Sequence, residues 1–266
     1  MAHYIKFIML AFLVISFSCQ AQEKDQTEFD QLNASKAWNL QLSDPCTGKW
    51  QDNWFMDGKL AKVENSEKGM NFIAGPVNRD DAHHAVLWTK ESFKGDIKME
   101  FNYTRTDSQL VNVNILYIQA AGIDTAPYDK DISKWDELRE IPTMSIYYNY
   151  MNPLHISYAA FPMVNDDPAN DYIRVRKYPI TKDRTFDETE IPPAFFKTGL
   201  FLPGVTYKIT VIKTISKLFF QVKGEGVEKL FSWELKEGQS PTEGRIGLRH
   251  MFTRSAQYSN IKVFVK

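Results

Sequence analysis

The sequence contains histidine, tyrosine and arginine residues whose chemistry suits the removal of a proton from carbon. His155 and Tyr158 lie three positions apart, and Arg249 stands beside His250 near the C-terminus. An imidazole or a phenol can move a proton, and a guanidinium can stabilise the anion that forms. β-Elimination on a uronic acid needs these groups, because a base must remove the acidic proton at C5 while a donor helps the group at C4 to leave. We predict His155, Tyr158 and Arg249 as catalytic residues, with His155 as base or acid and Tyr158 as its partner.

Further residues are predicted to bind the substrate. Arg174 and Arg176 alternate along one expected strand, so both side chains fall on the same face. Guanidinium groups bind carboxylates and sulfates through paired hydrogen bonds, which favours an acidic oligosaccharide as the partner. We predict that the two arginines contact its acidic groups, that His250 assists, and that Trp88 binds the substrate as an aromatic platform.

Strand phase predicts which of these residues share a face. Unbulged strands would direct four of them away from the core: His155, Arg174, Arg176 and Arg249. Tyr158 and His250 have the opposite phase, and would reach the same space only through a bulge or a strand end.

Other reaction classes lack their motifs. A glycosidase needs two placed carboxylates, and the acidic run at residues 136–140 has the pattern of a solvated loop. No Gly-x-Ser-x-Gly motif indicates a serine hydrolase. His83 and His84 are adjacent, so a strand would point them to opposite faces, away from a shared metal ion. Residues 165–171 offer oxygens to a structural calcium ion, but their spacing is that of a polar turn, and we predict no cofactor.

Alternating apolar and polar residues indicate an all-β fold. Residues 97–104 alternate strictly, and residues 207–211 repeat the pattern. Further strands are expected at residues 82–88, 111–119, 143–150, 155–161, 172–176, 217–222, 229–235, 245–251 and 259–265. Turns with glycine and proline separate them, and only residues 132–139 suggest a helical turn. The pattern predicts a sandwich or jelly roll that forms one domain over residues 50–266.

The N-terminus has the pattern of an export signal. An apolar run over residues 7–15 follows Lys6 and is too short to span a bilayer. Cleavage after Ala21 would remove residues 1–21 as a signal peptide, with residues 22–49 as a tether and lead-in to the domain. In the alternative, Cys19 becomes the lipidated first residue of a lipoprotein. Both routes place the protein outside the cytoplasm, as a periplasmic, secreted or membrane-anchored chain.

Composition narrows the possible partners and the means of stabilisation. The 266 residues include 32 basic and 33 acidic side chains, so the formal charge of −1 gives no basic footprint for nucleic acid. A hydrophobic fraction of 43% supports a packed core. Because Cys19 and Cys46 are the only cysteines, no disulfide is available to the processed chain. Cys46 is expected to be a small buried residue.

Four segments together resemble a known family. In chain order they are AVLW at 85–88, YIQAAG at 117–122, HISY at 155–158 and GRIGLRHM at 244–251. They resemble the YesU-like family, formerly a domain of unknown function. Residues 256–263 are also similar to the last strand of concanavalin-type sandwiches.

The resemblance implies a concanavalin A-like jelly roll and a carbohydrate-active protein from gene clusters for uronate-rich polysaccharides such as ulvan. Among ulvan-related relatives it implies an oligosaccharide dehydratase, which removes water from a terminal uronic acid. His155 and Tyr158 match the family's His-x-Ser-Tyr segment, and Arg249 matches its Ile-Gly-x-Arg segment. His250 stands where the family usually has Gln, and residues 175–178 depart from its Leu-Arg-Lys-Ser run, which leaves the acid and base roles open.

We therefore expect β-elimination on uronic-acid oligosaccharides, by loss of water rather than by chain cleavage. Two other functions stay open. One is a non-catalytic glycan-binding module or lipoprotein that stacks sugars on Trp50, Trp54 and Trp88. The other is a glycoside hydrolase with unusual acids. The sequence does not set the oligomeric state.

Overall fold

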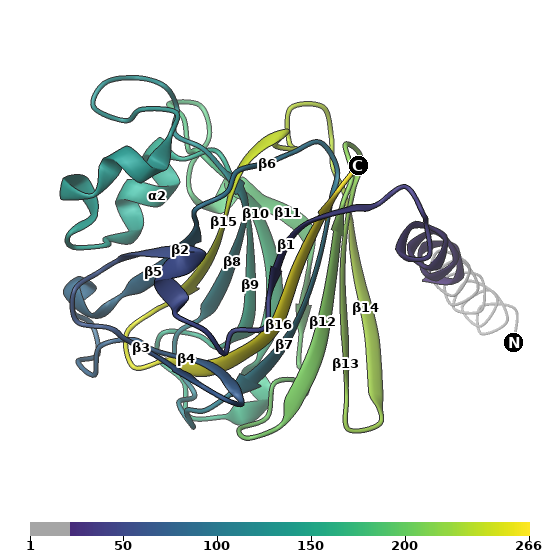
Figure 1. Ribbon diagram of the computed structural model, residues 1–266, viewed down its shortest axis with the longest axis horizontal. Coiled ribbons are helices and arrows are strands. Elements are labelled where there is room, and N and C mark those ends of the chain that lie inside the picture. The colour runs from purple at the N-terminus through teal and green to yellow at the C-terminus, as the bar shows by residue number, and fades with distance from the viewer. Residues whose placement is uncertain (1–21) are drawn as a thin grey trace, which may run out of the picture. The chain divides into compact units, whose positions relative to one another are not determined.

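Two antiparallel β-sheets form a sandwich in the computed structural model, which describes residues 22–266 of the chain (Figure 1). Sheet A runs in the order β14 (Val227–Glu234), β13 (Lys217–Gly224), β12 (Thr206–Lys213), β7 (Ile97–Arg105), β16 (Ser255–Val265), β4 (Gly69–Ile73) and β3 (Lys62–Ser66), and β1 (Asn39–Asp44) also pairs with β16. Sheet B runs in the order β11 (Glu190–Phe196), β10 (Tyr172–Lys177), β9 (Leu154–Ala160), β8 (Asn114–Ala120), β15 (Glu243–His250), β5 (Ala85–Thr89) and β2 (Trp54–Asp57), and β6 (Phe93–Lys94) pairs with β15. The predicted jelly-roll sandwich is confirmed.

The main core lies between the sheets and follows the alternation seen in the sequence. In β7, Met99, Phe101 and Tyr103 are at most 1% exposed, whereas the residues between them are partly exposed. Leu116 and Ile118 of β8 meet this core from sheet B. Burial of such side chains contributes about 1.5–3 kcal/mol each relative to exposure.

Sheet B is buried on its outer face as well. Ile115 and Tyr117 of β8 point away from the main core and pack in a second apolar cluster with Trp135 and Tyr147. Both partners belong to the segment of residues 121–153, which we call the cover. The cover contains helix α2 (Met144–Tyr150) and two 3-10 turns, Ile132–Trp135 and Glu137–Arg139, which agree with the helical turn expected at residues 132–139.

One expected strand is wrong. Residues 143–150 contain α2 instead of a strand. Their aromatic content favours strands, but Met144, Tyr147, Tyr148 and Met151 recur with the i, i+3, i+4 and i+7 spacing of a helix face. That face packs over sheet B, so tertiary burial stabilises the helix.

The N-terminal boundary of the sandwich also differs from the expectation. β1 pairs with β16 and lies in the predicted lead-in, so the sandwich begins before residue 50. Residues 22–33 are helical and belong to a separate unit that ends at Ala37. The predicted export signal at residues 1–21 and Cys19 lie outside the described residues. Within residues 22–266, no helix has the length and apolar character needed to cross a membrane.

Candidate functional site

A cleft of about 220 Å³ lies on the outer face of sheet B, over β8, β9 and β10. The three strands direct alternate side chains into it, among them Ile115, His155, Ser157, Arg174 and Arg176. Met144 and Tyr148 border it from α2, and Phe186 borders it from the loop after β10. The cleft therefore combines polar side chains of β9 and β10 with apolar ones, on strands whose opposite faces build the main core.

His155 lies at the centre of a short hydrogen-bonded chain in this cleft. Its Nδ1 lies 2.6 Å from the Tyr178 hydroxyl and its Nε2 lies 2.8 Å from Ser157 Oγ. Ser157 follows two positions later on the same strand face, and Tyr178 comes directly after β10. A neutral imidazole has one N–H and one lone pair, so one of these contacts donates from the ring and the other accepts onto it.

The surroundings keep both His155 and Tyr178 uncharged. Burial, followed by the charges of Arg176, Arg249 and Arg174, holds the pKa of His155 well below its usual 6.5. Burial and the neighbouring Tyr117 raise the pKa of Tyr178 well above its usual 10. The imidazole is therefore a free base at neutral pH, and the phenol keeps its proton.

Two arginines give the cleft a positive wall. Arg174 Nε lies 3.0 Å from Glu190 Oε2, and Arg176 Nη2 lies 3.7 Å from the same oxygen. Arg176 is further fixed by donating from Nη1 to the Phe186 carbonyl at 2.7 Å. One carboxylate thus faces two guanidinium groups, and the remaining charge favours an anionic ligand.

Arg249 shares the outer face of sheet B with His155 but does not line the cleft. It is fully buried beneath the cover, where Nη2 donates to the Pro142 carbonyl at 2.7 Å and lies 2.8 Å from His84 Nδ1. Its guanidinium lies 4.4 Å from the centre of the Tyr147 ring. Arg249 therefore acts on His155 through its charge, without access to a ligand in the cleft, and the prediction that it touches substrate is corrected.

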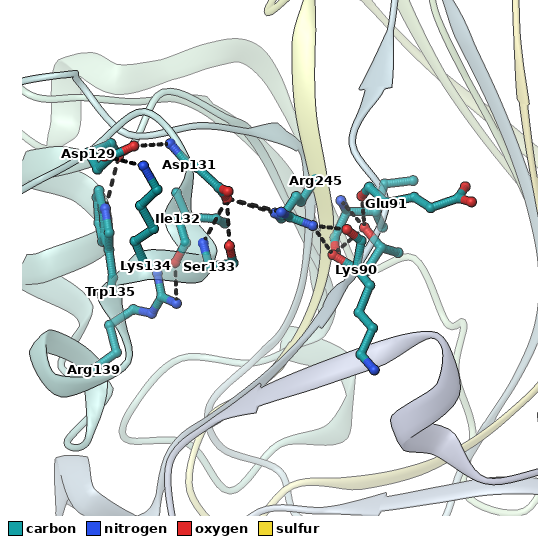
Figure 2. A network of polar contacts seen from close by, with 12 residues as sticks. Lys90, Glu91, Asp129, Asp131, Ile132, Ser133, Lys134, Trp135, Arg139 and Arg245 are labelled. Carbon is teal, nitrogen blue, oxygen red and sulfur yellow. Dashed lines mark hydrogen bonds and ion pairs between the residues drawn. The ribbon is translucent and has the colours of Figure 1, made fainter.

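The cover that hides Arg249 is held to sheet B by two ion pairs, one partly exposed and one buried. Figure 2 shows Arg245 of β15 between Asp131 of the cover and the backbone at the end of β5; Nη2 lies 3.0 Å from Asp131 Oδ1, and Nη1 donates to the Thr89 carbonyl at 3.0 Å. In the buried pair, Arg139 Nε of the cover lies 2.8 Å from Asp57 Oδ2 of β2, and both side chains are at most 2% exposed.

Trp88 is part of this attachment and is not a sugar platform. It is fully buried, its Nε1 donates to Asp57 Oδ2 at 2.6 Å, and it stacks on Tyr117 with 5.3 Å between ring centres. Trp54 is also buried, and Trp50 packs against the main core. The structure therefore contradicts the expectation that Trp54 and Trp88 present open faces to a ligand, whereas Trp50 is partly buried.

Tyr158 and His250 point to the other side of sheet B. Tyr158 lies in the main core, where its hydroxyl is 2.9 Å from that of Tyr258. His250 Nε2 lies 2.8 Å from the same Tyr258 hydroxyl, and its ring stacks on Phe72. Both residues keep the phase of their strands, so neither side chain reaches the cleft. The predicted catalytic role of Tyr158 and the predicted substrate-binding role of His250 are therefore corrected.

Sequence reasoning predicted His155 but missed Tyr178, its hydrogen-bond partner, although a signal was present. Arg174, Arg176 and Tyr178 follow each other at every second position, so the alternation that selected the two arginines extends to the tyrosine. Tyr178 lies one residue past the end of β10, and the strand expected from the sequence ends earlier, at residue 176. Ser157 shares the phase of His155 for the same reason.

In residues 165–171, the calcium candidate, Asn165 and Asp167 accept hydrogen bonds within their own turn, and Asp171 accepts from Thr198 and Gly199. Asp167 Oδ1 accepts from the Ala169 amide at 2.8 Å, and Asn165 Oδ1 accepts from Asn170 Nδ2 at 3.0 Å. Across residues 22–266, no group of three or more His, Cys, Asp or Glu side chains is arranged to hold a metal ion.

Comparisons with known proteins agree with the fold. The model of a domain of unknown function, DUF1961, matches residues 47–263 and confirms the family to which the motifs point. A protein of unknown function with a galectin-like fold from Bacillus subtilis is 20% identical, with a TM-score of 0.63 over 86% of this chain and 99% of that chain. No curated protein matches the sequence.

Two further solved structures are similar in fold. The metal-free exoplasmic/lumenal domain of VIP36 is 13% identical, with a TM-score of 0.54 over 86% of this chain and 94% of that chain. Lectin UEA-II complexed with galactose is 9% identical, with a TM-score of 0.53 over 86% of this chain and 100% of that chain. At these identities the likeness establishes the lectin-type sandwich alone.

Proposed function

The chain belongs to the DUF1961 family, and we propose that it binds uronic-acid oligosaccharides in the cleft of sheet B and acts on them by β-elimination. The observation that carries this proposal is the meeting of a neutral imidazole with two arginines in one cleft. His155, Arg174 and Arg176 come from adjacent strands and face the same space. A base beside a cationic wall is what removal of a proton next to a carboxylate requires.

Sugar binding is supported by fold and charge together. Lectin UEA-II, which shares the sandwich, is complexed with galactose in its structure. In this chain the cleft carries Arg174 and Arg176, so a sugar with a carboxylate is the preferred ligand. A carboxylate there would accept paired hydrogen bonds from a guanidinium and would offset the charge that lowers the pKa of His155.

We assign His155 as the base. With the ring proton on Nδ1, the imidazole donates to the Tyr178 oxygen and keeps its lone pair on Nε2, beside Ser157. Nε2 takes the C5 proton, the C–H electron pair forms the C4–C5 double bond, and the C4–O bond breaks. The leaving oxygen takes a proton from a phenol of the cleft, for which Tyr148 and Tyr172 are the two that line it. Tyr178 acts as a positioning residue that fixes the ring.

The size of the cleft favours loss of water from a chain end. Its volume of about 220 Å³ is below the range of about 300–1,000 Å³ typical of sites for larger ligands. The cleft therefore suits one sugar ring, whose C4 hydroxyl would leave as water. Cleavage within a chain would need space for a further ring beyond C4 of this sugar.

The test is incubation with saturated uronic-acid oligosaccharides, followed by ultraviolet absorbance and mass spectrometry. We expect a new conjugated double bond together with the loss of one water from the intact oligosaccharide. His155→Gln should abolish the absorbance change while substrate binding persists, and Tyr158→Phe serves as a control on the opposite face of the sheet. Fragments would indicate a lyase, and a flat absorbance trace across ulvan, pectin and alginate oligosaccharides would refute elimination.

A non-catalytic glycan-binding module is the second candidate, because lectins share this fold. It predicts heat of binding in calorimetry with unchanged oligosaccharide mass and no effect of His155→Gln on the ligand. A glycoside hydrolase would instead produce a new reducing end without a double bond. Location outside the cytoplasm, with or without a lipid on Cys19, is part of the proposal and is tested by fractionating cells that express the full chain.

A further inference from the structure

A second hollow adjoins the cleft on the same face of sheet B. It measures about 430 Å³ and is lined by Pro162, Asn170, Tyr172, Arg174, Phe196 and Lys197. Tyr172 and Arg174 line both spaces, so the hollow continues the cleft towards the edge of the sheet at β11. A ligand that fills the cleft can extend in this direction, whereas α2 borders the cleft on another side.

The wall of the hollow combines aromatic rings with a guanidinium. Tyr172 and Phe196 are opposite each other across β10 and β11, with 6.3 Å between ring centres. The Arg174 guanidinium lies 4.8 Å from the Tyr172 ring centre and 6.0 Å from that of Phe196. These contacts align the rings and the cation along one continuous surface.

Phe196 stands out because it is open to solvent. Its exposure is 61%, on the outermost strand of the sheet, where proteins usually carry charged or small residues. A single exposed aromatic residue is ordinary. Here, however, the ring lines a hollow together with Lys197, and Met163 of the adjoining cleft is also 57% exposed.

We propose that this hollow, floored by Tyr172, Arg174 and Phe196, binds the sugar next to the terminal uronic acid. The apolar face of that sugar packs on the Phe196 ring, and Lys197 binds an anionic substituent such as a sulfate or carboxylate. The inference rests on the proposed function, because the first sugar must occupy the cleft. The occupant is the second ring of the same oligosaccharide, since Tyr172 and Arg174 line both spaces.

The experiment measures binding by calorimetry, using glucuronic acid and saturated uronic-acid oligosaccharides of two and four sugars. We expect the two-sugar ligand to bind more tightly than the single sugar, with less further gain for four. Phe196→Ala should weaken binding of the two-sugar ligand by about tenfold, as removal of one buried aromatic contact would. The affinity for glucuronic acid should stay unchanged, because that ligand occupies the cleft alone. Lys197→Gln should weaken binding only of oligosaccharides that carry a second anionic group.

Leu202→Ala is the matched control, because Leu202 is 51% exposed and does not line either space. Equal affinities of all ligands for the Phe196→Ala variant and the wild type would overturn the subsite, as would equal losses for one and two sugars. Binding that depends on Phe196 without any double bond in the product would keep the subsite and refute elimination. Elimination with no effect of Phe196→Ala on affinity would support the reaction and refute the subsite. Absence of binding by every ligand would refute both the subsite and the proposed function.

Discussion

At the residue scale, the proposed chemistry depends on one contact between a ring nitrogen and a phenol. We expect Tyr178→Phe to lower kcat about 10- to 100-fold with little change in substrate affinity, as for other groups that orient a histidine. The reason is that the Tyr178 hydroxyl lies 2.6 Å from His155 Nδ1 and, in the proposed mechanism, accepts the Nδ1 proton and so leaves the Nε2 lone pair free for the substrate. Steady-state kinetics with the uronic-acid oligosaccharide measure the effect.

Tyr158→Phe provides the matched control for that change. Tyr158 is also a buried tyrosine in a hydrogen bond, but its partner is Tyr258 in the main core. Its loss should cost stability of about 1 kcal/mol and leave kcat intact. If the two variants lost the same activity, the His155–Tyr178 contact would have no special role.

The pH dependence of turnover is a second prediction at this scale. The pKa of His155 lies well below 6.5 in the free protein, so the acid limb of kcat/KM should fall below pH 6.5. A bound carboxylate offsets the charges of Arg176 and Arg174, so the acid limb of kcat should lie at higher pH than that of kcat/KM. Removing one cation by Arg174→Gln should raise the kcat/KM limb. If the acid limbs of kcat and kcat/KM coincided, and if Arg174→Gln did not move the kcat/KM limb, the assignment of His155 as base would be contradicted.

At the scale of elements, the cover is attached to sheet B by a buried ion pair. Asp57→Asn should destabilise the protein by about 3 kcal/mol, because it leaves Arg139 as an unpaired charge inside the protein. Denaturant unfolding measures the change. Amide exchange in the cover should increase more than exchange in β7 or β12, because these strands belong to the main core.

An exposed ion pair at the edge of the same cover serves for comparison. Lys59 Nζ lies 2.6 Å from Glu140 Oε1, but the two side chains are 70% and 58% exposed. Glu140→Gln should therefore change the free energy of unfolding by less than about 1 kcal/mol. Similar losses in Asp57→Asn and Glu140→Gln would show that burial of the pair at Arg139 is unimportant.

Elements differ in how far the sequence predicts them. β7 and the first half of β12 show clear alternation, because one face meets the core and the other is more open to water. β8 and β9 are buried on both faces, so burial does not distinguish the face toward the main core from the face toward the cleft and the cover. Only the types of their side chains do so. α2 was mistaken for a strand, since its aromatic residues satisfy strand preference and its helical spacing becomes decisive only once the cover packs on sheet B.

The residues of the candidate site also differ in how far the sequence predicts them. His155, Arg174 and Arg176 could be found from strand phase, because local alternation sets their direction. The burial of Arg249 and Trp88 could not, because it depends on the path of a cover more than 90 residues earlier in the chain than Arg249. Phase alone also predicted that Tyr158 and His250 needed a bulge or a strand end to reach the site. The pairing of β9 with β10 is irregular beside Tyr158, but both side chains stay on the side of sheet B that faces Tyr258.

At the scale of the whole molecule, buried neutral histidines make the fold sensitive to mild acid. Burial and Arg249 lower the pKa of His84 to about 2, and burial and Arg254 lower that of His250 to about 3. His155 shifts in the same direction. These pKa values are depressed in the folded state, so unfolding takes up protons below about pH 6.5. Stability is therefore fully present above that pH and declines as pH falls, by about 1.4 kcal/mol per pH unit for each histidine.

Thermal unfolding between pH 7 and 5 tests this expectation. His250→Gln should reduce the slope of stability against pH, whatever its effect on stability at pH 7. Asp57, whose pKa burial raises, opposes the trend, so the difference in slope between the variant and the wild type is the readout. An unchanged slope in the variant would rule out His250 as a contributor.

The single thiol of the described residues gives a further whole-molecule prediction. Cys46 is buried and unpaired, and burial and Asp44 raise its pKa to about 12. A thiol reagent should react with it only after unfolding, and a reducing agent should leave the melting temperature of residues 22–266 unchanged. Rapid alkylation of the native protein at neutral pH would contradict this packing.

Strands β8, β9 and β10 carry both the main core and the cleft on alternate side chains. Insertion or deletion of one residue in any of them would exchange the two sides and ruin both at once. The cover has no such constraint, because it contacts the sheet from one side only. Divergence in sugar preference among relatives should therefore accumulate in the cover and along the rim near β11, while the lengths of these three strands stay constant.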